Sequence, residues 1–353
     1  MAYTTINKSK DHFDGKIYLG SSSAVTVTGL EFQPDLVWVK DRDNGNNHCW
    51  VDAVRGVGKY IQSDNTSAEV NNSSQSISAF TSDGFTTGTA NPANESASTT
   101  KGFMSWNWKA GGSGSANTDG SINTTVSANT TAGFSIVTYT GNGQSGNNTF
   151  GHGLGTAPQL IMWMPRSGTT NKHFWSHALP LSGGEYQAMQ LNLQNAASAF
   201  GSSSVMNGQA PTSTVFTLEN ADYNNSGSTY VAYCFVEKTG YSKFGSYTGN
   251  GNADGVFVYT GFKPAFLLIK KYTDTSHWQM VDNKRPGYNP NSNYLRANKS
   301  DAEATDIPFD ILSNGFKARS TDGSYNASSQ SYIYMAFAEA PLVGTNNVPC
   351  TAR

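Results

Sequence analysis

The sequence is poor in charge and in long apolar runs, and each shortage argues against a class of protein. Charged residues make up only 14% of the 353 residues, whereas about 25% is usual. The formal net charge is −2 and no block of Lys and Arg occurs, so we expect no nucleic-acid surface. No run of 18 apolar residues exists, which argues against a transmembrane helix and membrane insertion.

Cysteine is also scarce. Cys49, Cys234 and Cys350 are an odd number and lack the short spacing of a metal site. Cys49 and Cys234 fall inside apolar segments, where a free cysteine packs as a small hydrophobe. We therefore expect no disulfide framework, no metal and no other cofactor. The N-terminus lacks the apolar core of a signal peptide, yet the composition is typical of extracellular β-proteins. We expect a protein that is made in the cytoplasm and acts outside the cell.

Catalytic motifs are missing as well. The chain has no nucleophile elbow and no zinc-binding helix motif. A glycoside hydrolase needs two facing carboxylates, and the only acidic positions that recur at constant spacing are Asp52 and Asp282. The sequence therefore predicts a protein that is not an enzyme.

What the chain does contain is one segment in three copies. Each copy is a proline, one free position and then a run of apolar residues, which predicts a strand buried on both faces. The copies are Pro34 to Lys40, Pro158 to Met164 and Pro264 to Lys270. Each is preceded by a Tyr and a nearby Gly and followed, at the end of its unit, by an aromatic strand: Phe103 to Trp108, Tyr230 to Phe235 and Tyr332 to Phe337.

The repeats are spaced by roughly the length of a domain, not by the 20 to 50 residues of a solenoid repeat. Asn, Ser, Thr and Gly carry most of the polarity, which suits turns and exposed strand faces. We predict an all-β fold of three tandem, jelly-roll-like β-sandwich domains joined by short linkers. The predicted parts are an N-terminal arm (1–10), unit 1 (11–110), a Gly/Ser/Asn/Thr linker (111–131), unit 2 (132–238), unit 3 (241–340) and a C-terminal tail (341–353). Residues 185–199 are the one candidate helix.

Two kinds of residue are candidates for a binding site. Trp50, Trp175 and Trp278 each follow a histidine by one or two residues, and aromatic faces stack on sugar rings; the alternative is that they are core or interdomain aromatics. Asp52 with Arg55, and Asp282 with Arg285, recur at the same distance from their prolines. They could bind an anionic sugar or a neighbouring chain, or form structural ion pairs.

The turn that begins at Asp41 has oxygen-bearing side chains at alternate positions, with Asp52 at the twelfth place, as in a calcium loop. Gly45 stands where the fifth-position ligand belongs, and the twelfth residue is not glutamate. A hairpin turn is the interpretation we favour.

Several segments together resemble a known family. They are Gly133 to Gly143, Gly151 to Gly155 with Pro158, and the ending Tyr334 to Pro341. These residues resemble a domain repeated in structural proteins of tailed bacteriophages, of the tail fibre or minor tail protein type that is common in marine phages. The resemblance covers nearly the whole chain and implies no catalytic residues.

From this resemblance we expect a virion structural protein, foremost a tail fibre or fibre-like appendage that attaches to host-surface glycan. The alternatives are a capsid decoration or knob protein or a baseplate adaptor that binds other virion proteins, and a polysaccharide-degrading tailspike. The expected partners are other virion proteins, further copies of the chain, with a trimer favoured, and a cell-surface glycan. Weak glycan contacts suit such a role because many copies on one particle multiply them.

Overall fold

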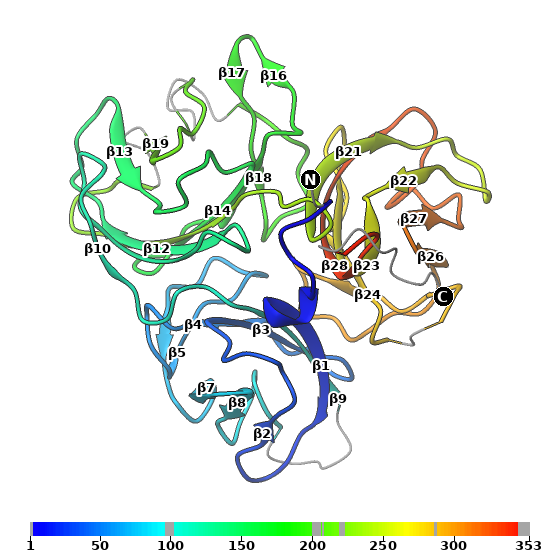
Figure 1. Cartoon of the computed structure of the whole chain (residues 1–353), viewed down its shortest axis with the longest axis horizontal. Helices are drawn as coiled ribbons and strands as arrows, with labels where there is room; N and C mark the ends of the chain where they lie inside the picture. Colours follow the sequence, from blue (N-terminus) through cyan, green and yellow to red (C-terminus); the bar gives the residue numbers. More distant parts are fainter. Residues whose placement is uncertain are drawn as a thin grey trace.

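The computed structural model describes residues 3–95, 102–199, 206, 208–218, 223–285 and 288–344. In this part of the chain the regular structure is β-strand, apart from one 3₁₀ turn, η1 (Ser9–Asp11). The predicted all-β class is confirmed. Three β-sandwiches lie around a common centre, and each forms one lobe of the molecule (Figure 1). We call them the first, second and third sandwich in chain order.

In each sandwich the main sheet places the same four strands in the same order. The sheet of the first sandwich is ordered β1 (Phe13–Leu19), β9 (Gly102–Trp108), β3 (Leu36–Asp41) and β4 (Cys49–Asp52). The equivalents in the second are β12 (Phe134–Thr140), β20 (Thr229–Phe235), β14 (Leu160–Pro165) and β15 (His173–Ser176). Those in the third are β21 (Ser242–Thr248), β28 (Ser331–Pro341), β23 (Phe262–Lys271) and β24 (Gln279–Asp282). The repeated segment of the sequence is thus the third strand of each set.

Shorter strands complete the sandwiches. The first adds β2 (Thr26–Val27), β8 (Gly84–Thr87) and β7 (Ile77–Thr81), and the pair β5 (Lys59–Tyr60) and β6 (Val70–Asn71). The second adds β10 (Ser115–Asn117), β11 (Thr124–Asn129) and β18 (Met189–Gln190) to its main sheet, and the pairs β13 (Asn148–Gly151) with β19 (Val215–Leu218) and β16 (Leu181–Ser182) with β17 (Glu185–Tyr186). The third adds β25 (Leu295–Arg296) to its main sheet, and a sheet of β22 (Phe257–Tyr259), β27 (Gly315–Ala318) and β26 (Phe309–Leu312).

The repeated strands are buried on both faces because they separate two cores. Successive side chains of a strand point to opposite faces. In β3, Val37 and Val39 pack inside the first sandwich, whereas Leu36 and Trp38 join a cluster that all three sandwiches share. We call that cluster the shared core. Its buried members include Trp38, Trp50, Trp106 and Trp108 of the first sandwich, Phe134, Met162 and Phe235 of the second, and Phe266, Met335 and Phe337 of the third.

The sandwiches are therefore not independent domains joined only by linkers. Each keeps an inner core of its own, and each also depends on its neighbours to cover one face of its main sheet. The N-terminal segment contributes to this closure, because Ile6 is 2% exposed within the shared core and the Tyr3 hydroxyl donates to the Gly261 carbonyl of the third sandwich at 3.1 Å.

Two sequence-based assignments need correction. Residues 111–131 are not a linker in the structure, because β10 and β11 extend the main sheet of the second sandwich beside β12. Ile122 and Val126 give the stretch its apolar anchor in the core of that sandwich. Residues 185–199 form no helix; β17, β18 and turns occupy them.

Candidate functional site

The three tryptophans that we considered for sugar stacking are buried. Trp50, Trp175 and Trp278 are 0%, 3% and 1% exposed, so none of them can offer a face to a ligand outside the protein. Trp50 and Trp278 lie in the shared core, and Trp175 lies in the inner core of the second sandwich. The alternative interpretation, core aromatics, describes them.

These tryptophans are also not equivalent to one another. Trp50 pairs with Trp38 across β3 and β4, and the residue in the corresponding register of the second sandwich is Phe174, opposite Met162. Trp175 pairs with Ile161 and so points to the other face of its sheet. The similar spacing from a histidine along the chain does not reflect the strand register.

Asp52 and Arg55 form a buried ion pair at the boundary between the first and second sandwiches. Both side chains are 0% exposed, with 2.5 Å between Arg55 Nε and Asp52 Oδ2. Asp52 Oδ2 also accepts a hydrogen bond from the Tyr233 hydroxyl of the second sandwich at 2.8 Å. Arg55 Nη1 reaches Glu69 at 3.1 Å, and Glu69 accepts two bonds of 3.0 Å from Arg166 of the second sandwich. Asp52, Arg55, Glu69 and Arg166 thus form a ladder of alternating charge across the boundary.

The same ladder recurs between the third and first sandwiches. Arg285 lies 2.7 Å from Asp282 and 2.5 Å from Glu303, and Glu303 accepts two bonds of 2.9 Å from Arg42 of the first sandwich. Trp106 takes the place of Tyr233 and donates from Nε1 to Asp282 at 3.2 Å. Burial alone would raise the pKa of Glu303, but hydrogen bonds and charge from Arg42 and Arg285 lower it to about 2.

The third boundary, between the second and third sandwiches, has apolar residues in place of this ladder. The backbone N–H of Glu69 donates to the Arg166 carbonyl, that of Glu303 to the Arg42 carbonyl, and that of Ala197 to the Tyr272 carbonyl. Ala197 therefore occupies the position of the two glutamates, and Leu179 that of the two arginines. Leu179 belongs to the shared core, with Ala197 and Tyr272 packed against it. The two Asp/Arg pairs serve to join sandwiches, and they are not exposed to a ligand.

A second set of polar contacts links each sandwich to the next. His48, Lys172 and Trp278 occupy equivalent positions, because their backbone N–H groups donate to the side chains of Asp64, Asn192 and Asn298, respectively. The side chain of each reaches across a boundary to a backbone carbonyl. His48 Nε2 lies 3.0 Å from the Arg296 carbonyl, Lys172 Nζ donates to that of Ser67 at 2.8 Å, and Trp278 Nε1 donates to that of Gln190 at 3.0 Å. His48 Nδ1 accepts a bond from Trp38, and burial lowers the pKa of His48 to about 3. His48 is thus a neutral structural residue.

The turn after β3 is a hairpin loop, as we favoured. β3 and β4 pair in antiparallel fashion on either side of it. The Asp41 carboxylate accepts bonds from the backbone N–H groups of Asp43 and Asn44 and from the side-chain amides of Asn44 and Asn46. Four donors thus bond to this carboxylate within the turn. Over the described residues, no group of three or more His, Cys, Asp or Glu side chains is placed to hold a metal ion.

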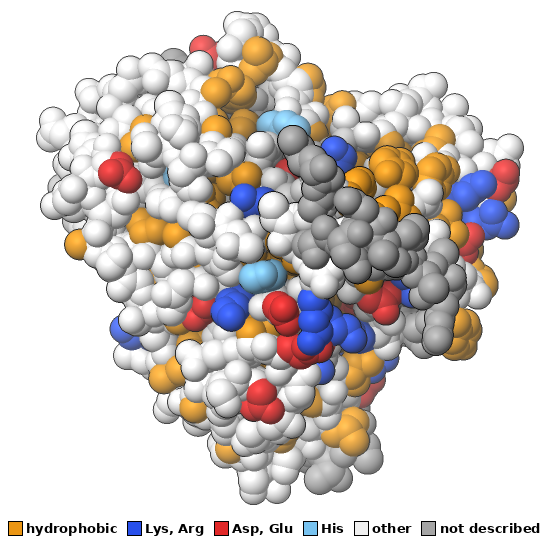
Figure 2. All heavy atoms as spheres, in the orientation of Figure 1, with side chains coloured by type: hydrophobic (Ala, Val, Ile, Leu, Met, Phe, Trp, Pro, Cys, Tyr) orange, Lys and Arg blue, Asp and Glu red, His pale blue; other side chains and the backbone are white. Residues whose placement is uncertain are grey.

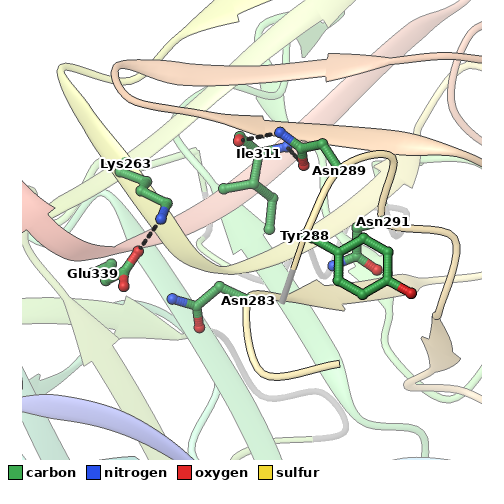
Figure 3. A pocket seen from close by; sticks show the side chains of 7 residues that line it. All are labelled: Lys263, Asn283, Tyr288, Asn289, Asn291, Ile311 and Glu339. Atoms are coloured by element: carbon green, nitrogen blue, oxygen red, sulfur yellow. Dashed lines mark hydrogen bonds and ion pairs between the residues drawn. The ribbon is translucent and has the colours of Figure 1, made fainter. Parts of the chain in front are cut away.

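An open pocket of about 490 Å³ lies on the third sandwich and is the candidate functional site. Figure 3 shows Lys263 and Glu339 on one side, Tyr288 and Asn289 on the other, and Asn283 between them. Lys263 and Glu339 are ion-paired at 2.7 Å, and each side chain is 32% exposed. The side chain of Asn289 exchanges two hydrogen bonds with the backbone of Ile311. Tyr288 is 71% exposed, the highest value among the exposed large hydrophobic side chains that the structure describes.

None of the pocket residues was a candidate from the sequence. The loop that carries Tyr288, Asn289 and Asn291 occurs in the third sandwich without a counterpart in the repeat pattern, so a search for repeated residues passes over it. Its signal in the sequence is an aromatic residue among asparagines, Tyr288-Asn-Pro-Asn291, three residues after Arg285.

On the face that Figure 2 shows, most atoms belong to uncharged polar side chains or to the backbone, and the charged side chains gather in a few groups. In the part of the chain that the structure covers, no helix has the length and apolar character needed to span a membrane.

Comparison with known proteins identifies a family without assigning an activity. No curated protein matches the chain. A family model described as "Domain of unknown function (DUF7483)" matches residues 8–341 as one stretch. That stretch begins before β1 and ends with β28, so it contains all three sandwiches and the boundaries between them. The chain belongs to this family, DUF7483, whose function is unknown.

Proposed function

We propose that the chain is a structural protein of a tailed-bacteriophage virion, of the tail fibre or fibre-like type, and that it attaches the particle to glycan on the host surface. The resemblance of residues 133–143, 151–158 and 334–341 to the phage structural domain supports the virion assignment. The observation that carries the attachment role is the pocket of the third sandwich. It combines an exposed aromatic ring with amide, amine and carboxylate groups, the side chains that recognise sugars.

The shared core suits a virion protein that must stay folded under mechanical stress outside the cell, because it holds the three sandwiches together. Two boundaries contain buried ion pairs, and apolar residues of the shared core take their place at the third. Attachment does not need one strong site, because several copies on a particle raise the effective concentration of each contact. We therefore propose that the chain works as an oligomer, with a trimer as the first state to test, together with other virion proteins.

Two measurements test this function. Antibodies against the chain, with gold labels, are expected to decorate the tail or fibres of particles that encode it. The purified chain is expected to compete with those particles for adsorption to host cells. Particles without label would contradict the virion assignment, and unchanged adsorption would contradict the attachment role.

One observation favours a second role, as an adaptor or decoration protein that binds other virion proteins. Strand β22 lies at the edge of its sheet, and its residues Phe257 and Tyr259 are 47% and 52% exposed. An open edge strand can accept a strand from a partner. Label on the capsid or baseplate, together with unchanged adsorption, would favour this role.

The proposal assigns no catalytic step. A tailspike that cleaves polysaccharide needs a pair of carboxylates in its site, and Glu339 is the one carboxylate among the residues that line the pocket, already ion-paired with Lys263. Release of reducing sugar from host polysaccharide is the assay that would support the tailspike alternative.

A further inference from the structure

One position that lines the pocket holds a different residue in each of the three sandwiches. Directly after the fourth main-sheet strand, the N–H groups of Ala53, His177 and Asn283 donate to the carbonyls of Asp35, Gln159 and Ala265, respectively. Ala53 carries only a methyl group. His177 places Nε2 2.8 Å from the Phe244 carbonyl and 3.6 Å from Glu237. Asn283 instead places a buried Oδ1 without a hydrogen-bond partner among the described residues.

A buried acceptor without a donor is costly to leave unsatisfied. Because Asn283 Oδ1 is closed to solvent, a ligand hydroxyl or amide N–H satisfies it only when the side chain turns toward the pocket. The Asn283 side chain lies between the Lys263–Glu339 pair and Tyr288 at the base of the pocket (Figure 3). Nothing comparable arises at Ala53, which has no polar side chain, or at His177, whose ring already has partners.

The Lys263–Glu339 pair defines the charge that the pocket accepts. The ammonium group offers donors and the carboxylate offers acceptors side by side, an arrangement that matches two adjacent hydroxyl groups. Because the two groups neutralise each other at 2.7 Å, no unpaired cation remains among the lining residues to bind a carboxylate or sulfate. This argues for an uncharged ligand.

The remaining wall is aromatic and held in place. Asn291 is 2% exposed and donates to the Asp282 carbonyl, and Asn289 exchanges bonds with Ile311, so both ends of the short segment after Tyr288 are fixed. A preorganised loop reduces the entropy lost on binding. An exposed ring such as that of Tyr288 stacks on the apolar face of a sugar.

We propose that this pocket binds an uncharged pyranose unit of a glycan, stacked on Tyr288 and hydrogen-bonded to Asn283 and to the Lys263–Glu339 pair. The inference rests on the proposed attachment function for its biological setting, and it names the class of sugar that the site takes. It excludes uronic and sialic acids as the preferred ligands.

The test is saturation-transfer NMR on the full chain with defined probes: the methyl pyranosides of glucose, galactose, mannose and N-acetylglucosamine, and sodium glucuronate as the charged comparison. At least one neutral glycoside is expected to receive saturation. Its signal should fall about fivefold or more in Tyr288→Ala and in Asn283→Ala. Leu181→Ala, which removes an exposed apolar side chain of the second sandwich outside this pocket, should leave the signal unchanged.

Absence of signal from all four neutral glycosides, equal signal in both pocket variants, or stronger binding of glucuronate would each overturn the inference. Melting curves of the variants establish that they are folded; if Asn283→Ala is not, Tyr288→Ala decides alone, because its side chain is largely exposed. Sugar binding in a chain that gold labelling does not find on particles would leave the pocket assignment standing and refute the virion function. Labelled particles without sugar binding would do the reverse.

Discussion

The hydroxyl of Tyr233 in the second sandwich donates a 2.8 Å hydrogen bond to Oδ2 of Asp52 in the first, and the same oxygen lies 2.5 Å from Nε of Arg55. All three side chains are buried. One carboxylate thus joins an ion pair within one repeat to a side chain of the next. In the third repeat, Asp282 has the same relation to Trp106.

The first prediction concerns this ion pair. Replacing one partner of a buried pair leaves the other charge without compensation and typically costs about 3–5 kcal/mol. Arg55→Leu is therefore expected to lower the free energy of unfolding by about that amount, measured by denaturant titration. The combined variant Asp52→Ser, Arg55→Leu, Glu69→Ala, Arg166→Tyr, Tyr233→Phe copies the apolar chemistry that replaces the ladder at the third boundary and should be more stable than Arg55→Leu alone. A combined variant less stable than the single one would contradict the view that the two chemistries are interchangeable.

The second prediction separates buried aromatics from exposed ones. Trp50→Ala removes a side chain that is 0% exposed in the shared core, and such changes cost about 3–5 kcal/mol. Tyr288→Ala removes a side chain that is 71% exposed, and surface substitutions of this kind stay within about 0.5 kcal/mol. Unfolding midpoints in denaturant measure both. Equal destabilisation by the two variants would be inconsistent with their positions in the structure.

The third prediction follows from the acid titration of Glu303. The pKa of its carboxyl falls from an ordinary value of 4.5 to about 2 in the folded protein. A group with a depressed folded pKa stabilises the fold above its unfolded pKa and loses that contribution as the pH falls. We expect the stability difference between wild type and Glu303→Gln to shrink between pH 4.5 and about pH 2. A difference that is constant over this window would refute the ion-pair assignment of Glu303.

The fourth prediction uses the two buried thiols as reporters of closure. Cys49 and Cys234 are both 0% exposed, and burial raises the pKa of Cys49 to about 12 and that of Cys234 further. In a Cys350→Ser background, which removes the cysteine outside the described residues, a thiol reagent such as Ellman's reagent should label neither in the native protein. Both should react after unfolding in denaturant. Rapid labelling of the native protein would show that a sandwich opens.

Part of this fold could be predicted from the sequence because it is local. The run Leu36 to Val39 is apolar at every position, which predicts a strand buried on both faces, and the structure confirms it. What covers the second face is not local. Trp38 meets residues of other sandwiches, such as Phe266 at a ring distance of 6.3 Å, and no pattern within one repeat can state that partner.

The misassigned stretches have the same origin. Residues 111–131 are as polar as a linker because β10 is an edge strand and few positions of the stretch are buried, and Ile122 and Val126 anchor it in the core. The tryptophans were aligned by their distance from a histidine, whereas strand register decides the face to which a side chain points. The pocket was not predicted because Lys263, Asn283 and Tyr288 come from separate segments of the chain, and only the fold brings them together.

Having three sandwiches in one polypeptide has a consequence for how the molecule can change. In a homotrimer of single-sandwich chains, every substitution would appear three times, once at each boundary. Here the equivalent positions hold alanine, histidine and asparagine (Ala53, His177 and Asn283), and two boundaries contain a buried Asp/Arg pair that the third lacks. Because the three sandwiches are parts of one polypeptide, a substitution at one of three equivalent positions leaves the other two unchanged. One sandwich can therefore change the residues that bind a ligand, while the other two keep the contacts that hold the three together.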